Sequence, residues 1–187
     1  MKVAAVQALV IVDVQAAFVT GTHAVSDAEA LLARIAGLLA RAREAGSLVI
    51  HLQNDGRPGT DDEPGQPGWE LQLPTAGTEP VIRKAHDDGF CGTSLAGALL
   101  GHQVRRLAVA GVMSEMCVSA TARSALEKGF GVVLPHDAHA TYDIPAAPGF
   151  GQAVPAAIVA RVAEWALGDQ IELVRRAEDV TFAAAGT

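Results

Sequence analysis

The sequence predicts a single α/β domain, a three-layer α/β/α sandwich built around a mostly parallel six-stranded sheet. Short apolar runs that are typical of buried strands alternate along the chain with segments of helical periodicity. Such alternation requires crossover connections, which make neighbouring strands parallel and cover both faces of the sheet with helices. We find no repeat, low-complexity segment or linker that would divide residues 1–187, and this length fits one domain.

The first expected strand and helix occupy residues 8–44. Residues 8–12 are a continuous apolar run that ends at Asp13, as in strands that are buried on both faces. Ser26 and Glu29 stand at the spacing of a capping box in front of a helical apolar repeat. Gly46 supplies the stop signal for that helix.

The next two strands enclose a long loop. Residues 47–52 are a second buried run and residues 80–84 a short third strand, and residues 53–78 between them contain nine glycines and prolines. Loops of this length inside compact domains are usually functional, so we expect a binding loop or a lid here.

The second half of the chain continues the alternation. A short helix, a fully apolar strand and a helix that begins near Cys117 come first, followed by a strand, a segment that contains a helix broken early by Pro155, and a last strand. In chain order these are residues 92–101, 106–111, 117–128, 131–135, 148–167 and 171–174.

Composition excludes several classes of function. The net charge of −7 disfavours nucleic acids and anionic membrane surfaces, which attract clusters of Lys and Arg. No apolar run approaches the roughly 18 residues that a membrane helix needs. Two cysteines are too few for a disulfide scaffold, so we expect a cytoplasmic protein with no membrane or nucleic-acid partner.

Three reactive side chains follow expected strands. Asp13 ends the first strand, Lys84 ends the third, and Cys117 comes shortly after the fourth. Ligands of doubly wound sheets bind outside the carboxyl ends of the strands, so these groups should share one rim. Taken singly, each has an ordinary structural explanation: a turn aspartate, a solvated lysine and a buried core cysteine.

A carboxylate, an ammonium and a thiol at one rim suit nucleophilic catalysis. Only the thiolate attacks well, and a helix N-terminus and Lys84 would both stabilise it, although an ionised Asp13 would oppose them. We therefore expect the pKa of Cys117 to lie below the ordinary value near 8.5. The turn at residues 111–117 exposes backbone N–H groups that can hold an oxyanion.

Four segments resemble motifs of the isochorismatase-like cysteine hydrolases, and they follow that family's order over nearly the whole chain. The first is Asp-x-Gln-x-x-Phe at the end of the first strand, the second a Lys followed by Phe-x-x-Thr-x-Leu, the third the nucleophile segment, and the fourth follows the fifth strand. They occupy residues 13–18, 84–95, 110–122 and 137–141. The resemblance implies an isochorismatase-like fold of Rossmann-like topology.

The resemblance also implies roles for the matching residues. Cys117 would be the nucleophile, Asp13 the general base and later acid, and Lys84 the cation that orients Asp13. The Val112–Met113 peptide bond would be cis, so that the amides of Met113 and Cys117 form the oxyanion hole.

The implied activity is hydrolysis of a C–N bond in a small amide, lactam or ureide through a thioester. Acidic residues such as Glu115 suggest a cationic substrate, and homo-oligomers are common in the family. Phe18 and Trp69 are further pocket candidates. Two alternatives stay open: vinyl ether hydrolysis of the isochorismatase type, which that branch performs without a cysteine nucleophile, and a non-catalytic binding domain on the same fold.

No cofactor or metal is expected. Metal-dependent relatives carry an Asp-x-His pair and a further His after the second strand, and this chain has no histidine between His51 and His86. We expect His136 and His139 to be structural or to support neighbouring groups. Cys91 matches no nucleophile pattern and is expected to be structural.

Overall fold

A computed structural model describes residues 4–186 and has the expected three layers. Within these residues seven strands form one sheet in which every strand pair is parallel. The strands are β1 (Ala8–Val12), β2 (Leu48–Asn54), β3 (Val81–Lys84), β4 (Arg106–Val112), β5 (Gly131–Pro135), β6 (His139–Ala140) and β7 (Glu172–Val174). The predicted fold class is therefore confirmed, with the two-residue β6 as an addition that the sequence pattern did not reveal.

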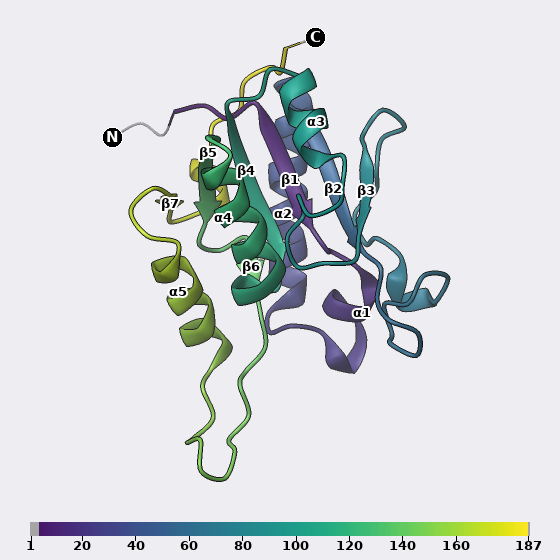
Figure 1. The fold of residues 1–187 in the computed structure, drawn as a ribbon, viewed down its shortest axis with the longest axis vertical. Coiled ribbons are helices and arrows are strands. Elements are labelled where there is room, and N and C mark those ends of the chain that lie inside the picture. Colours follow the sequence, from purple (N-terminus) through teal and green to yellow (C-terminus); the bar gives the residue numbers. More distant parts are fainter. Residues whose placement is uncertain (1–3, 187) are drawn as a thin grey trace.

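Helices cover both faces of the sheet, with α3 and α4 on one face and α2 on the other (Figure 1). The α-helices are α1 (Ala16–Val19), α2 (Ala28–Glu44), α3 (Leu95–Gly101), α4 (Ser119–Glu127) and α5 (Ala156–Ala166). Three short 3-10 turns, η1 (Gly21–His23), η2 (Pro67–Trp69) and η4 (Ala177–Asp179), and a π-helical turn, η3 (Ser114–Val118), complete the elements. None of the helices in residues 4–186 is long and apolar enough to cross a membrane.

Strand β1 shows why a continuous apolar run makes a central strand. All five of its residues are buried, and successive side chains point to opposite faces of the sheet. Leu9 and Ile11 join the core on the α2 side, whereas Val10 and Val12 join the core on the α3 and α4 side. An alternating pattern would have left one face polar, so the run itself requires helices on both sides.

The strands lie in the spatial order β3-β2-β1-β4-β5-β7. The chain therefore adds β2 and β3 on one side of β1 and then returns to add β4 on the other side, so the β1–β4 pair is the topological switch point. Val12 and Gly111 are partners across this pair. Gly111 has φ +133°, and a Cβ atom there would lie 2.0 Å from the Val12 carbonyl oxygen, so only glycine fits. This close approach of two backbones marks the carboxyl edge at which ligands of such sheets bind.

The helix starts differ from two expectations. Ser26 does not cap α2, because Asp27 takes a left-handed φ of 54° as the N-cap residue and makes no side-chain cap hydrogen bond. The helix expected over residues 117–128 also does not begin as an α-helix at Cys117. The π-helical turn η3 carries Cys117, and α4 starts two residues later at Ser119.

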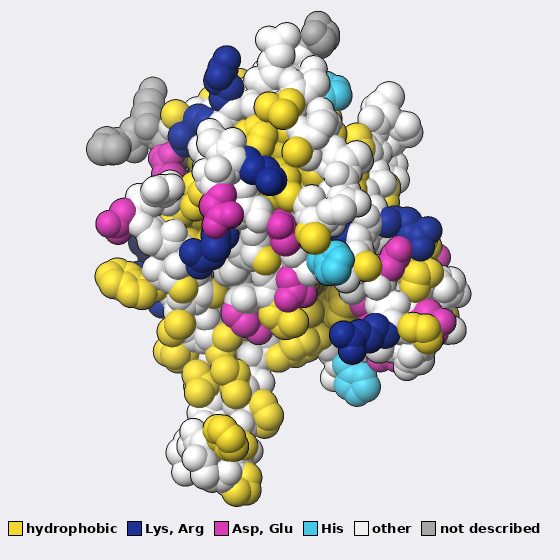
Figure 2. Space-filling view, in the orientation of Figure 1, with side chains coloured by type: hydrophobic (Ala, Val, Ile, Leu, Met, Phe, Trp, Pro, Cys, Tyr) yellow, Lys and Arg dark blue, Asp and Glu magenta, His cyan; other side chains and the backbone are white. Residues whose placement is uncertain are grey.

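A two-stranded arm formed by residues 141–155 projects from the body between β6 and α5 (Figure 1). Antiparallel bridges join Ile144 to Val154 and Ala147 to Gly151. Hydrophobic side chains follow the arm along its length (Figure 2). Phe150 is 94% exposed, so the arm adds apolar surface without adding to the core.

Candidate active site

The three reactive side chains that the sequence singles out meet at the carboxyl edge of the sheet. Lys84 Nζ lies 2.7 Å from Asp13 Oδ2 and 3.3 Å from Cys117 Sγ. Asp13 and Lys84 are both buried. Asp13 follows β1, Lys84 ends β3 and Cys117 follows β4, so the sheet brings together groups that are separated by 71 and 33 residues in the chain.

Asp13 is held in an uncommon backbone conformation. Its φ of 51° is left-handed, and its N–H donates to the Leu52 carbonyl at 3.1 Å. Oδ2 is occupied by Lys84, but the buried Oδ1 has no hydrogen-bond partner in residues 4–186. A buried carboxylate oxygen with an open acceptor position suits a general base.

Lys84 is also fixed by groups that sequence reasoning did not identify. Its ammonium donates to Asn54 Oδ1 at 3.3 Å and to the His86 carbonyl at 3.2 Å. Asn54 Nδ2 in turn donates to Asp62 Oδ2 at 2.7 Å, which orients the amide oxygen towards Lys84. Asn54 follows a buried run directly, as Asp13 does, and that position was the one available signal.

The electrostatics of the three groups are strongly coupled. Burial raises the pKa of the Asp13 carboxyl to about 6, although the adjacent Lys84 ammonium lowers it. Burial lowers the pKa of Lys84, but the charge of Asp13 and the hydrogen bonds to Asp13 and Cys117 outweigh burial and hold that pKa above its ordinary value. At neutral pH the carboxylate and the ammonium are therefore both charged.

The expected lowering of the Cys117 pKa is wrong in sign. Burial raises the pKa of the Cys117 thiol, and the charge on Asp13 raises it further, while Lys84 opposes both. Cys117 also lies within the π-turn, where it does not occupy the N-terminus of an α-helix. The resting thiol keeps its proton, so a base must remove the proton as the sulfur attacks.

The turn that carries Cys117 is tightly closed. The Val118 N–H donates to the Met113 carbonyl at 3.1 Å, a bond that spans five residues. The peptide bond between Val112 and Met113 is cis, as the family resemblance implies. Met113 is the residue immediately before the turn, so its amide and that of Cys117 belong to one compact backbone segment.

The pocket candidates occupy different surroundings. Phe18 packs on the hydrophobic core of the α2 face. The Trp69 indole donates to Asp55 at 3.0 Å and lies under the Arg83 guanidinium, so the tip of the long loop is anchored to the end of the sheet. Glu115 is exposed and accepts a hydrogen bond from Thr141 at 2.9 Å.

Acidic groups border the thiol. Asp87 is exposed, and its Oδ1 lies 3.6 Å from Cys117 Sγ. Acidic side chains gather on the face of the molecule that carries α4 (Figure 2). Cys91, in contrast, is an exposed free cysteine with no place in this arrangement.

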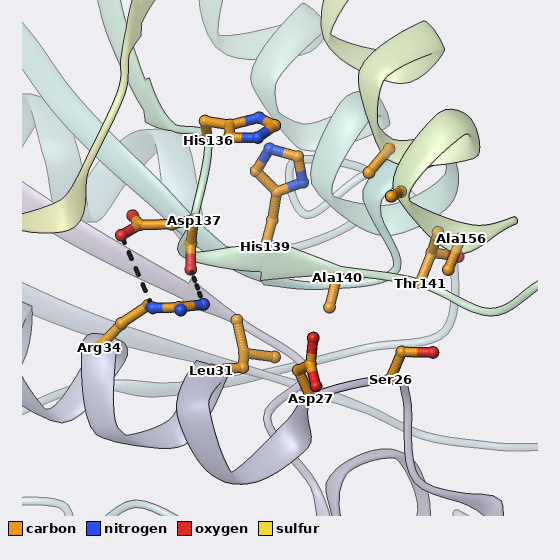
Figure 3. A pocket seen from close by; sticks show the side chains of 12 residues that line it. Ser26, Asp27, Leu31, Arg34, His136, Asp137, His139, Ala140, Thr141 and Ala156 are labelled. Atoms are coloured by element: carbon orange, nitrogen blue, oxygen red, sulfur yellow. Dashed lines mark hydrogen bonds and ion pairs between the residues drawn. The ribbon is translucent and has the colours of Figure 1, made fainter.

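A separate cavity of about 310 Å³ lies near α2, β6 and the start of α5, and the three reactive residues do not line it (Figure 3). His136 and His139 lie one above the other on one wall, and Arg34 pairs with Asp137 below them (Figure 3). Within residues 4–186 no group of three or more His, Cys, Asp or Glu side chains is arranged to hold a metal ion.

Comparison with known proteins adds three findings. The model of the isochorismatase domain matches residues 7–158. Two proteins of Streptomyces noursei, each called streptothricin hydrolase, are 61% identical over 96% of this chain, which spans 72% of one and 66% of the other. The crystal structure of an isochorismatase from Pseudomonas putida KT2440 superposes with a TM-score of 0.85 at 29% identity, covering 93% of this chain and 90% of that one.

Proposed function

The chain is a hydrolase of the isochorismatase family, and on that premise we propose that Cys117 cleaves a carbon–nitrogen amide bond of a small molecule. The resemblance found in four sequence motifs is confirmed by the match over residues 7–158. One observation carries the assignment of the site: a buried ammonium, Lys84, bridges a carboxylate at 2.7 Å and a thiol at 3.3 Å.

The first half of the reaction forms a thioester. Cys117 Sγ attacks the carbonyl carbon while Asp13 accepts the thiol proton, and the carbonyl π electrons move to the oxygen. The amides of Met113 and Cys117 receive this oxyanion. Collapse of the tetrahedral intermediate breaks the C–N bond, and Asp13 returns its proton to the leaving amine.

The second half hydrolyses the thioester. Asp13, ionised again, takes a proton from water as the water oxygen attacks the carbonyl carbon. The C–S bond then breaks, and the proton on Asp13 returns to the departing sulfur. Lys84 stays protonated throughout, because its pKa lies above the ordinary value of a lysine. Its ammonium holds Asp13 and balances the negative charge near the sulfur.

Streptothricin is the first substrate to test, since the two relatives at 61% identity bear its name. The exposed Asp87, whose carboxylate lies 3.6 Å from the thiol sulfur, favours a cationic molecule, and so do the exposed Glu115 of the same turn as Cys117 and the net charge of −7. Simple amides, lactams and ureides complete the panel of substrates.

The experiment compares two cysteine variants. Cys117→Ala should abolish amine release from the panel while leaving the fold intact, and Cys91→Ala is the matched control that should retain most activity. Turnover by Cys117→Ala, together with an inactive Cys91→Ala, would overturn the assignment. Vinyl ether cleavage that survives Cys117→Ala would identify isochorismatase-type chemistry, and no turnover of any substrate would favour a binding domain.

We also propose that the active form is a homo-oligomer. Ile158, Val162 and Trp165 form one apolar stripe along α5, and they are 54%, 60% and 79% exposed. In a symmetric pair of chains, the two copies of this stripe would cover each other and remove their exposed apolar side chains from water. A second copy of the chain therefore fits the surface.

Light scattering coupled to gel filtration tests this surface. Trp165→Glu should lower the measured mass to that of the monomer, whereas Leu100→Gln on α3, 65% exposed, should leave it unchanged. A wild-type protein that elutes as a monomer at high micromolar concentration would refute the oligomer. We also propose that the protein is cytoplasmic. Its two cysteines are free, and free thiols are typical of reducing compartments.

A further inference from the structure

A buried polar cluster that the proposed reaction does not use lies against the turn that carries Cys117. We call it the Ser114 cluster; its members are Ser114, His139, Glu164, His136 and Arg161. Ser114 Oγ is 2.8 Å from His139 Nδ1, and His139 Nε2 is 3.1 Å from Glu164 Oε1. His136 Nδ1 reaches the same Glu164 oxygen at 2.5 Å, and Arg161 binds the other at 3.1 Å.

The direction of the hydrogen bonds follows from the charge on Glu164. Burial raises the pKa of Glu164, but hydrogen bonds from His139 and His136 outweigh burial and hold it below its ordinary value. An ionised carboxylate only accepts, so His139 donates through Nε2. In a neutral ring Nδ1 then accepts the proton of the Ser114 hydroxyl, which fixes both the tautomer of His139 and the rotamer of Ser114.

Ser114 is held at two points. Its carbonyl accepts a hydrogen bond from Ser119 Oγ at 2.7 Å, in addition to the contact of its hydroxyl with His139. Ser114 follows Met113 and precedes Cys117 by three residues within the π-turn. The cluster therefore ties α5 and β6 to the middle of the backbone segment whose amides face the substrate in the proposed reaction.

A second nucleophilic site is excluded by burial. Ser114, His139 and Glu164 resemble the residue types of a hydrolytic triad, but Ser114 is 1% exposed and no substrate can reach its oxygen. His139 is also buried, although it borders the cavity of Figure 3. The cluster acts through the backbone that it holds.

We propose that Ser114, His139 and Glu164 are positioning residues that set the geometry of the Met113–Cys117 oxyanion turn. The proposal rests on the proposed function, because it assumes that this turn receives the oxyanion. Displacement of reacting groups by about 1 Å can cost on the order of 100-fold in rate. A residue that holds the turn should therefore affect kcat more than substrate binding.

The test uses kcat per active site, KM and the rate at which iodoacetamide labels Cys117. Ser114→Ala should lower kcat about 10- to 100-fold while KM stays within about threefold, since the ground state does not use the oxyanion hole. Labelling of Cys117 should stay within about threefold, because its thiol chemistry depends on Asp13 and Lys84. His139→Leu should match Ser114→Ala, and the double variant should be no worse than either, as expected of residues that act as one unit.

His139→Asn is the rescue variant. An asparagine amide can occupy the place of Nδ1 and keep the contact with Ser114, so kcat should recover at least partly relative to His139→Leu. Thermal unfolding of each variant measures the structural cost separately. If Ser114→Ala had the same kcat per labelled active site as the wild type, whatever its stability, the proposal would be overturned. Failure of the proposed function looks different, since Cys117→Ala would then still turn over.

Discussion

Replacing Lys84 with Met tests the link between the cation and the base. The substitution keeps much of the side-chain volume but removes an ammonium that lies 2.7 Å from Asp13 Oδ2. The pKa of Asp13, about 6 in the intact site, is lowered by Lys84, so it must rise when Lys84 is lost. An opposite charge at this range lowers a carboxyl pKa by about 1 to 3 pH units.

The size of the effect follows from that range. With a pKa of about 6, Asp13 is about 90% ionised at pH 7, and a rise of about 1 to 3 pH units leaves about half to about 1% ionised. Because only ionised Asp13 can accept the thiol proton, kcat/KM at pH 7 should fall about 2- to 100-fold from this cause alone. Breaking a buried ion pair also lowers the free energy of unfolding by about 3–5 kcal/mol when the remaining charge stays uncompensated.

The assay is the dependence of kcat/KM on pH. In the wild type kcat/KM should fall as the pH drops below 6, because Asp13 becomes protonated there. In Lys84→Met this fall on the acid side of the pH profile should move to higher pH by about 1 to 3 units. Iodoacetamide labelling of Cys117 should also move to higher pH, since Lys84 lowers the pKa of the thiol. The exposed Lys128→Met is the matched control. An acid limb and a labelling profile that both stay in place would show that Lys84 is not coupled to Asp13 and Cys117.

Three further outcomes are expected. Activity should survive exhaustive chelation with EDTA, since no histidine lies between His51 and His86, and recovery of a chelated, inactive enzyme on adding zinc or manganese would contradict this. Gly111→Ala should lower the free energy of unfolding in urea by about 3 kcal/mol or more, because its Cβ would meet the Val12 carbonyl, whereas Gly37→Ala on the exposed face of α2 should be neutral or stabilising. Asn54→Leu should lower kcat about tenfold by removing an acceptor of Lys84, with the exposed Gln66→Leu as control; equal rates in the two variants would remove Asn54 from the site.

The strands were predictable because their signal is local. Residues 8–12 and 131–135 have the predicted bounds, and four other strands differ by one or two residues at one or both ends. A continuous apolar run needs no information from the rest of the chain to be recognised as a strand buried on both faces. The two-residue β6 escaped notice, because only its pairing with Gly111 and Val112 makes it a strand.

The reactive residues were predictable for a topological reason. Parallel strands end at the same edge of a sheet, so Asp13, Lys84 and the segment after β4 had to approach one another once the strands were assigned. Asn54 and Asp62 were not predictable in this way, because their roles depend on the direction of one side-chain amide. The Ser114 cluster was missed because His139 and Glu164 come from elements that are adjacent only in space.

The sequence by itself determined the fold class and, to within two residues, the positions at which the strands end, since both depend on local residue patterns. The nucleophile candidate came from one of these positions together with the family resemblance. Only the tertiary structure decided the protonation of the site. The direction of the Cys117 pKa depends on how deeply the thiol is buried and on its distances from Asp13 and Lys84, and burial opposes the thiolate more strongly than Lys84 favours it. Desolvation and the distance between charges are properties of the assembled protein, which no short stretch of sequence contains.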